Sequence, residues 1–130
     1  MAFVDSNIWI AYLNKEDKFH RKSLDVLSRL KRMERIFVSS GIVYEVVNFL
    51  FKLKGKKVAD GTLDFFLSSP QIEIVVPSDE TWEKTVSIFK ENELSLTDAQ
   101  IVACMYEKKE KEIYSFDRHF DTIKSIERIS

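Results

Sequence analysis

The chain has 130 residues, of which 45% are hydrophobic and 32% are charged, with only 3 glycines and 2 prolines. This composition excludes disordered, collagen-like and low-complexity proteins, and the length predicts a single domain over residues 1–130. Lysine and arginine number 20 against 21 acidic residues. No overall charge therefore attracts the protein to nucleic acid or to membranes, and any such binding site has to be local.

The apolar periodicity predicts the following elements in chain order. A strand at residues 2–5 precedes helices at 6–13 and 17–33, and a strand at 36–38 precedes helices at 42–53 and 58–68. A strand at 72–76 precedes helices at 78–92 and 96–109, and the chain ends with a strand at 113–116 and a weak strand near Ile126. Because parallel strands need long crossovers, this alternation predicts an α/β fold with a parallel sheet covered by helices on both faces.

The remaining composition favours a reducing compartment and excludes several cofactors. Cys104 lies in an apolar helical pattern that is typical of a reduced, buried thiol. No apolar run approaches the roughly 20 residues of a membrane span, and an acid at position 5 comes too early for a signal peptide. We therefore expect a cytoplasmic protein without a membrane partner. The two histidines are far apart, which argues against zinc, and the glycines fit neither a phosphate-binding loop nor a dinucleotide motif.

Three acidic residues lie where α/β sheets collect ligands, beyond the carboxyl ends of strands. Asp5 ends the first strand, Asp117 follows the strand at 113–116, and Asp98 opens the helix at 96–109. Each also has a local explanation: Asp5 as a helix cap, Asp98 in a capping box with Ser95, and Asp117 in a turn. For these three residues both explanations stay open.

Glu45 lies in the most apolar helix, where most directions around the helix are expected to be buried. No lysine or arginine lies one turn away from it. A buried carboxylate needs a tertiary partner, for which a divalent cation is one candidate. A distant salt bridge or an exposed edge of the helix is the alternative.

Together the four acids indicate a metal site. Carboxylates that converge repel one another unless a cation is bound, and hard oxygen ligands suit Mg²⁺ or Mn²⁺. The chemistry most consistent with such a site is phosphodiester hydrolysis, in which metal charge stabilises the developing oxyanions. The rival class transfers phosphate to an aspartate, as in receiver domains and haloacid-dehalogenase-like phosphatases. Those proteins need paired acids at the first strand, whereas this chain has Asp5-Ser6-Asn7.

Four segments resemble motifs of the PIN-domain nucleases, in particular the VapC-type toxins. They are Phe3-Val4-Asp5-Ser6-Asn7, Val43-Tyr44-Glu45-Val46, Ser95-Leu96-Thr97-Asp98-Ala99 and Tyr114-Ser115-Phe116-Asp117-Arg118-His119-Phe120. The resemblance covers essentially the whole chain in the family's order. It implies a three-layer α/β/α fold with about five parallel strands in the order 3-2-1-4-5, in which Asp5 and Asp117 would be neighbours.

The resemblance also implies roles for individual residues. Asp5, Glu45, Asp98 and Asp117 would be the catalytic and metal-binding acids, with Asp121 as a weaker fifth ligand. Polar positions that support the acids or the attacking water would be Ser6, Asn7 and Thr97. Ordinary helix capping is the alternative for Ser6 and Thr97. His20, which follows the first motif, is expected to be a packing residue of the second helix.

An acidic site needs nearby cations to hold RNA, because phosphates bind lysine and arginine. The candidates for RNA binding are Lys52, Lys54, Lys56, Lys57, Arg118 and His119. A solvated turn is the alternative for the lysines. Trp9, Tyr12 and Phe120 could stack on bases, although the core is the more common place for such aromatic residues.

These observations predict an endoribonuclease that depends on Mg²⁺ or Mn²⁺. The resemblance implies products with a 5′-phosphate and a 3′-hydroxyl, a role as the toxin of a toxin–antitoxin pair, a homodimer and a VapB-like antitoxin. An association surface is expected where any of four phenylalanines is exposed: Phe49, Phe51, Phe65 and Phe66. The alternatives are a PIN nuclease in RNA processing and a PIN-fold module that binds RNA or protein without catalysis. The presence of all four acids favours catalysis.

Overall fold

The computed structural model describes residues 1–33 and 35–130. Its centre is a parallel sheet of five strands in the order β3-β2-β1-β4-β5. The strands are β1 (Ala2–Val4), β2 (Ile36–Ser39), β3 (Ile72–Val75), β4 (Glu112–Tyr114) and β5 (Glu127–Ile129). Phe3 of β1 is paired with Phe37 of β2 on one side and with Ile113 of β4 on the other. The expected α/β fold and strand order are confirmed.

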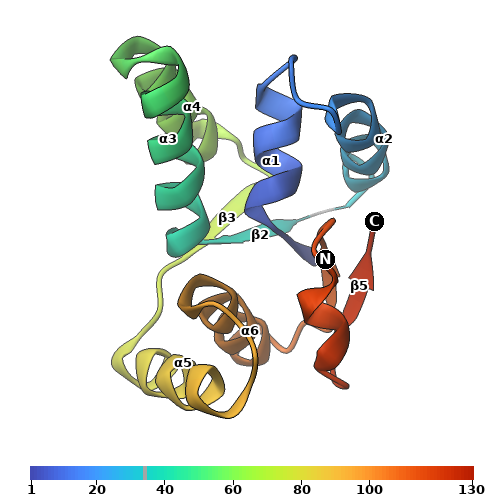
Figure 1. Ribbon diagram of the computed structural model, residues 1–130, viewed down its shortest axis with the longest axis vertical. Coiled ribbons are helices and arrows are strands. Elements are labelled where there is room, and N and C mark those ends of the chain that lie inside the picture. The colour runs from blue at the N-terminus through green and yellow to red at the C-terminus, as the bar shows by residue number, and fades with distance from the viewer. Residues whose placement is uncertain (34) are drawn as a thin grey trace.

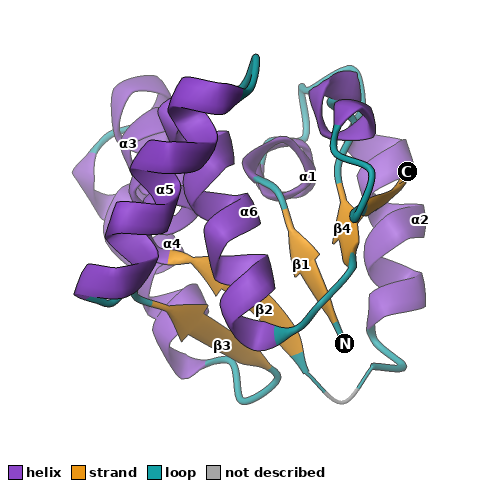
Figure 2. Ribbon diagram, turned by 90° about the horizontal axis from the view of Figure 1, so that it is seen from below, coloured by secondary structure: helices purple, strands orange, loops and turns teal. Residues whose placement is uncertain are grey.

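Helices cover both faces of this sheet. They are α1 (Ser6–Leu13), α2 (His20–Leu30), α3 (Ser40–Lys54), α4 (Lys56–Ser68), α5 (Asp79–Glu91), α6 (Leu96–Lys108) and the short 3₁₀ helix η1 (Arg118–Thr122). Helices α1 to α4 lie on one side of the sheet, and α5 and α6 lie on the other (Figure 1). Right-handed crossovers explain this division, because the chain steps outward from β1 to β3 and then returns to β4. Seen from below, α5 and α6 cross in front of the sheet (Figure 2).

The core lies between these layers. Every residue of β1 and β2 is buried, as expected for central parallel strands, which read as continuous apolar runs. Trp9 and Phe120 are also buried in the core, so neither can stack on a base. Burial raises the pKa of the Cys104 thiol to about 12, which agrees with the inert, reduced thiol expected from the sequence.

Several element boundaries differ from the sequence prediction. Helix α2 begins at His20 and not at residue 17, because the Asp17 side chain accepts a hydrogen bond from the Phe19 N–H (2.8 Å) and forms a turn. The expected break at residues 54–57 is reduced to Gly55, whose φ of 90° favours glycine. Strand β4 ends at Tyr114 and not at Phe116.

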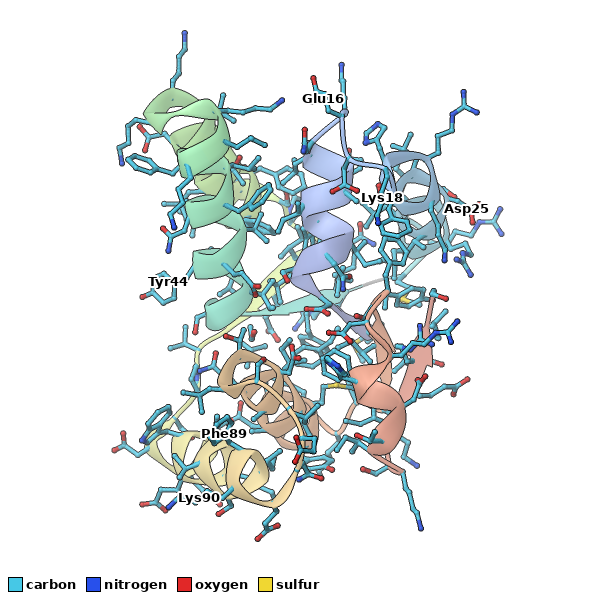
Figure 3. The ribbon with its side chains drawn as sticks, in the orientation of Figure 1. Glu16, Lys18, Asp25, Tyr44, Phe89 and Lys90 are labelled. Carbon is cyan, nitrogen blue, oxygen red and sulfur yellow. The ribbon has the colours of Figure 1, made fainter. Side chains whose placement is uncertain are left out.

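The expectation that α3 is buried on most sides is wrong. The helix buries only one side, formed by Ile42, Val43, Val46 and Leu50. Glu45 is exposed, and Tyr44 projects from α3 away from the rest of the protein (Figure 3). The structure therefore agrees with the alternative of an exposed helix edge for Glu45. The C-terminal half of α3 also carries apolar residues in solvent, among them Phe49, Phe51 and Leu53.

Among the described residues, no helix has both the length and the apolar character that a bilayer crossing requires.

Candidate metal centre

Asp5 lies at the junction of β1 and α1. Its backbone N–H donates to the Tyr114 carbonyl (3.0 Å), which extends the pairing of β1 with β4. Its carboxylate accepts a hydrogen bond from the Ser6 N–H (2.7 Å), so the predicted helix-capping role is confirmed. The side chain is only 3% exposed, yet it lines the floor of a cleft of about 550 Å³. A helix cap thus also fixes a carboxylate at the carboxyl end of the central strand.

The other three acids reach the same cleft from different elements. Asp98 comes from the first turn of α6, where its N–H donates to Ser95 Oγ (3.1 Å); Ser95 therefore caps the helix, which is one half of the predicted capping box. Asp117 precedes η1, and its Oδ1 accepts from the His119 N–H (2.9 Å). Glu45 comes from the second turn of α3. Acids that lie far apart in the sequence therefore meet at the carboxyl ends of the strands.

Ser115 holds Asp5 and Asp117 together. Its hydroxyl donates to Asp5 Oδ2 (2.7 Å) and accepts from the Asp117 N–H (3.0 Å). Asn7 adds a second link, because its amide nitrogen donates to Asp5 Oδ2 (3.3 Å) and its amide oxygen accepts from the Phe116 N–H (3.2 Å). Ser115 was not predicted as a site residue, although a hydroxyl within an apolar strand segment was a visible signal.

Burial and mutual repulsion disfavour the ionised form of two carboxyl groups in the cleft. Burial raises the pKa of Asp5 to about 6; the hydrogen bond from Ser115 opposes this rise, and repulsion from Asp98 and Glu45 adds to it. Burial likewise raises the pKa of Asp98, where the hydrogen bond with Ser95 opposes the rise and repulsion from Asp117 and Glu45 adds to it. A bound cation would relieve both effects.

The donor set fits a hard divalent cation. Asp98, Asp117 and His119 each offer one ligand atom, and these atoms lie within 4.8 Å of one another. The carboxylates of Asp5 and Glu45 line the same cleft. Carboxylate oxygens in this number are the ligands that Mg²⁺ and Mn²⁺ prefer. His119, predicted only as an RNA-binding residue, lies with the acids: its Nδ1 is 3.1 Å from Asp117 Oδ1.

The structure does not bring Asp121 into this group. Both of its carboxylate oxygens accept hydrogen bonds from Arg128, at 2.9 and 3.1 Å, and this pairing lowers the pKa of Asp121. Asp121 does not line the cleft. Its role is to tie η1 to β5.

The remaining predicted residues divide between the cleft and the outer surface. Ser6, Asn7 and Thr97 line the cleft. Away from it, Lys54 lies 3.5 Å from Glu16 and Lys56 lies 3.2 Å from Asp60. The three remaining predicted RNA-binding residues are also exposed and do not line the cleft: Lys52, Lys57 and Arg118. The expected packing role of His20 agrees with its ring nitrogen Nδ1 lying 2.7 Å from the Ala11 carbonyl oxygen.

A further contact links two of the acid-bearing helices. The Gly41 N–H of α3 donates to Gln100 Oε1 of α6 (3.1 Å). A Cβ atom at position 41 would lie 2.6 Å from that oxygen, so glycine allows the close approach. Glu45 lies one turn after Gly41 and Asp98 lies two residues before Gln100, so this contact joins the two helix segments that carry these carboxylates. Nothing in the sequence pattern identified it.

We expect Ser115→Ala to weaken Mn²⁺ binding about 10- to 100-fold, because Asp5 and Asp117 lose the hydroxyl that orients them. Leaving buried groups without a partner should also cost about 1–3 kcal/mol of folding free energy. Calorimetric Mn²⁺ titration and urea unfolding measure the two effects. Ser28→Ala removes an exposed serine hydroxyl outside the cleft and is the matched control. Equal Mn²⁺ affinity in the two variants would contradict the orienting role.

A model of the PIN domain family matches residues 2–126. A search of curated protein sequences gave no match.

Solved structures with the same fold include a toxin, a toxin–antitoxin complex and VapBC2. The VapC20 toxin of Mycobacterium tuberculosis, described as cleaving the sarcin-ricin loop, has 21% identity and a TM-score of 0.84 over 95% of each chain. A toxin–antitoxin complex from Klebsiella pneumoniae has 20% identity and a TM-score of 0.74, over 100% of this chain and 97% of the other. VapBC2 of Rickettsia felis, bound to a promoter DNA fragment, has 20% identity and a TM-score of 0.72, over 98% and 96%.

Proposed function

This chain belongs to the PIN domain family, and we propose that it is a metal-dependent endoribonuclease, the toxin of a toxin–antitoxin pair. The observation that carries the proposal is the convergence of four carboxylates in one cleft. Two of these carboxylates, Asp5 and Asp98, have raised pKa values because they are buried close to other negative charges. A cluster of this kind is costly for folding and is explained by the cation that it holds.

The residues that would hold Mg²⁺ or Mn²⁺ are Asp5, Glu45, Asp98 and Asp117. Such an ion supplies the activated water and the positive charge that phosphodiester hydrolysis needs. Ser115 and Asn7 keep Asp5 in its ligating orientation through hydrogen bonds to Oδ2. Asp5 and Asp98 must each give up their proton before they act as ligands, so the raised pKa values couple ion binding to pH.

Basic side chains at the cleft and along α3 and the start of α4 would hold the RNA backbone. His119 lines the cleft, and the exposed Arg118 precedes it. Lys52 and Lys54 lie on α3, with Lys52 about 10 Å along the helix axis beyond Glu45. Lys56 and Lys57 continue this group at the start of α4. These residues would bind phosphates without reading the base sequence.

The antitoxin and the homodimer are proposed on two grounds. Similar structures include a toxin–antitoxin complex and VapBC2, which supports a VapB-like antitoxin as the partner. The exposed apolar side chains of α3 and α4 support association with a second copy, and they include Phe49, Phe51, Leu53, Leu63 and Leu67. We further propose that residues 1–130 form one PIN domain that acts in the cytoplasm.

The proposal is tested by cleavage of end-labelled RNA with Mn²⁺, with Mg²⁺ and with EDTA. We expect internal cuts with either metal, none in EDTA, and products that carry a 5′-phosphate and a 3′-hydroxyl. Ligation of the products, with and without prior phosphatase treatment, identifies the ends. Cuts that persist in EDTA, or that leave 2′,3′-cyclic phosphates, would overturn the metal-dependent mechanism.

A further inference from the structure

Two phenylalanine rings lie together at the edge of the acidic cleft. Phe19 comes from the turn before α2, and Phe116 comes from the loop between β4 and η1. Their ring centroids are 5.3 Å apart, with 39° between the ring planes. Phe19 lines the cleft and remains 41% exposed, while Phe116 is half-buried and directly precedes Asp117. An aromatic surface is therefore open to solvent beside the acids.

Hydrogen bonds hold the two backbone segments from which these rings project. The Phe19 N–H donates to Asp17 Oδ1 (2.8 Å), which holds the turn in which Phe19 lies. The Phe116 N–H donates to the side-chain oxygen of Asn7 (3.2 Å), and the nitrogen of the same Asn7 amide donates to Asp5 Oδ2 (3.3 Å). A single side chain thus connects the aromatic pair to the most buried carboxylate. A surface positioned in this way requires little ordering when a ligand binds.

A lysine ammonium group lies over each ring. Lys18 Nζ lies 5.0 Å from the ring centroid of Phe19, and Lys22 Nζ lies 5.0 Å from that of Phe116. Both lysines are exposed, and Lys18 is seen near the turn between α1 and α2 (Figure 3). Ammonium groups beside aromatic rings, next to a cleft that repels phosphate, provide the two interactions that a single-stranded nucleic acid needs: stacking for a base and charge for the backbone.

We propose that Phe19 and Phe116 form a platform on which a base of single-stranded RNA stacks beside the acidic cleft, while Lys18 and Lys22 contact the adjacent phosphates. The platform rests on the proposed ribonuclease function, and it would hold one base of the RNA next to the acids. Phe19 and Phe116 thus take the stacking role that the sequence suggested for Trp9 and Phe120, which are buried.

The test measures binding in the Asp98→Asn background, where cleavage does not interfere. The probes are a fluorescein-labelled single-stranded RNA of random sequence and an abasic ribose-phosphate oligomer of the same length. We expect Phe19→Leu to weaken RNA binding at least about fivefold and to leave binding of the abasic oligomer unchanged, because only stacking is lost. Phe19→Tyr should keep the parent affinity for both probes. Lys22→Gln should weaken both probes and reduce the salt dependence.

Tyr106→Leu is the matched control, because Lys84 Nζ lies 5.3 Å from the Tyr106 ring, outside the cleft. It should change neither affinity. If Phe19→Leu binds both probes as the parent does, the platform is overturned, and cleavage by the wild-type chain still decides the ribonuclease function separately. If the wild-type chain neither binds nor cuts RNA, the ribonuclease function and the platform both fail.

Discussion

Asp98→Asn is expected to lower metal-dependent RNA cleavage by roughly a thousandfold or more while the chain stays folded. Asp98 lines the cleft and lies within ligand distance of Asp117 and His119. Asparagine has nearly the same shape but lacks the negative charge that a divalent cation requires. The helix cap survives the change, because the Asp98 backbone N–H donates the bond to Ser95 Oγ. Single-turnover cleavage of end-labelled RNA measures the loss, and circular dichroism checks the fold.

Asp121→Asn is the matched control for this variant. It makes the same chemical change in an acid that the sequence also proposed as a ligand, but Asp121 is paired with Arg128 and lies outside the cleft. We expect it to cut RNA at close to the wild-type rate. If both variants cut equally well, or if Asp121→Asn alone is inactive, the assignment of the metal ligands is wrong.

The second large effect concerns pH and the burial of Asp5. In the folded protein its pKa is about 6, well above the ordinary value of 3.8. Between these two values the folded state holds a proton that the unfolded state releases, so stability falls as pH rises from about 4 to about 6. The difference corresponds to about 3 kcal/mol for the metal-free protein. Asp98 shifts in the same direction and adds to the fall.

Urea unfolding in EDTA at several pH values measures this dependence. Other carboxyl groups titrate in the same range, so the informative quantity is the difference between the wild type and Asp5→Asn, which cannot lose a proton at this position. Relative to the variant, the wild type should be more stable at pH 4 than at pH 7. A difference that does not change with pH would show that Asp5 has an ordinary pKa in the folded protein.

The fold was predictable because its signals are local. Short apolar strands and amphipathic helices alternate, and the four motifs that resemble PIN domains implied the strand order that the structure shows. Helix boundaries were less predictable, since they depend on single hydrogen bonds. Asp17 ends the turn before α2 by accepting the Phe19 N–H, and no apolar pattern reports such a bond. The prediction that α3 is buried on most sides failed for a related reason. Its exposed apolar residues suggest burial, yet no other element of the described chain covers them.

The candidate site was predictable where the sheet topology alone determines which residues meet. Asp5 follows β1 and Asp117 follows β4, and these two strands pair directly with each other, so topology alone brings the two acids together. Asp121 has the same chemistry, but a tertiary partner, Arg128, decides its position. Ser115, Gln100 and Phe19 act through contacts between residues far apart in the chain. The apolar neighbours of Ser115 mark its hydroxyl as unusual, but the sequence does not identify the partners of any of the three.

The central claim is that the four carboxylates form a metal site that cuts RNA. A calorimetric titration of Mn²⁺ into the wild type and into Asp98→Asn, followed by RNA cleavage with the same samples, tests it most directly. We predict that the wild type binds Mn²⁺ and cuts RNA, and that the variant loses both properties together. A wild-type chain that binds no Mn²⁺, or a variant that binds and cuts as the wild type does, would contradict the claim.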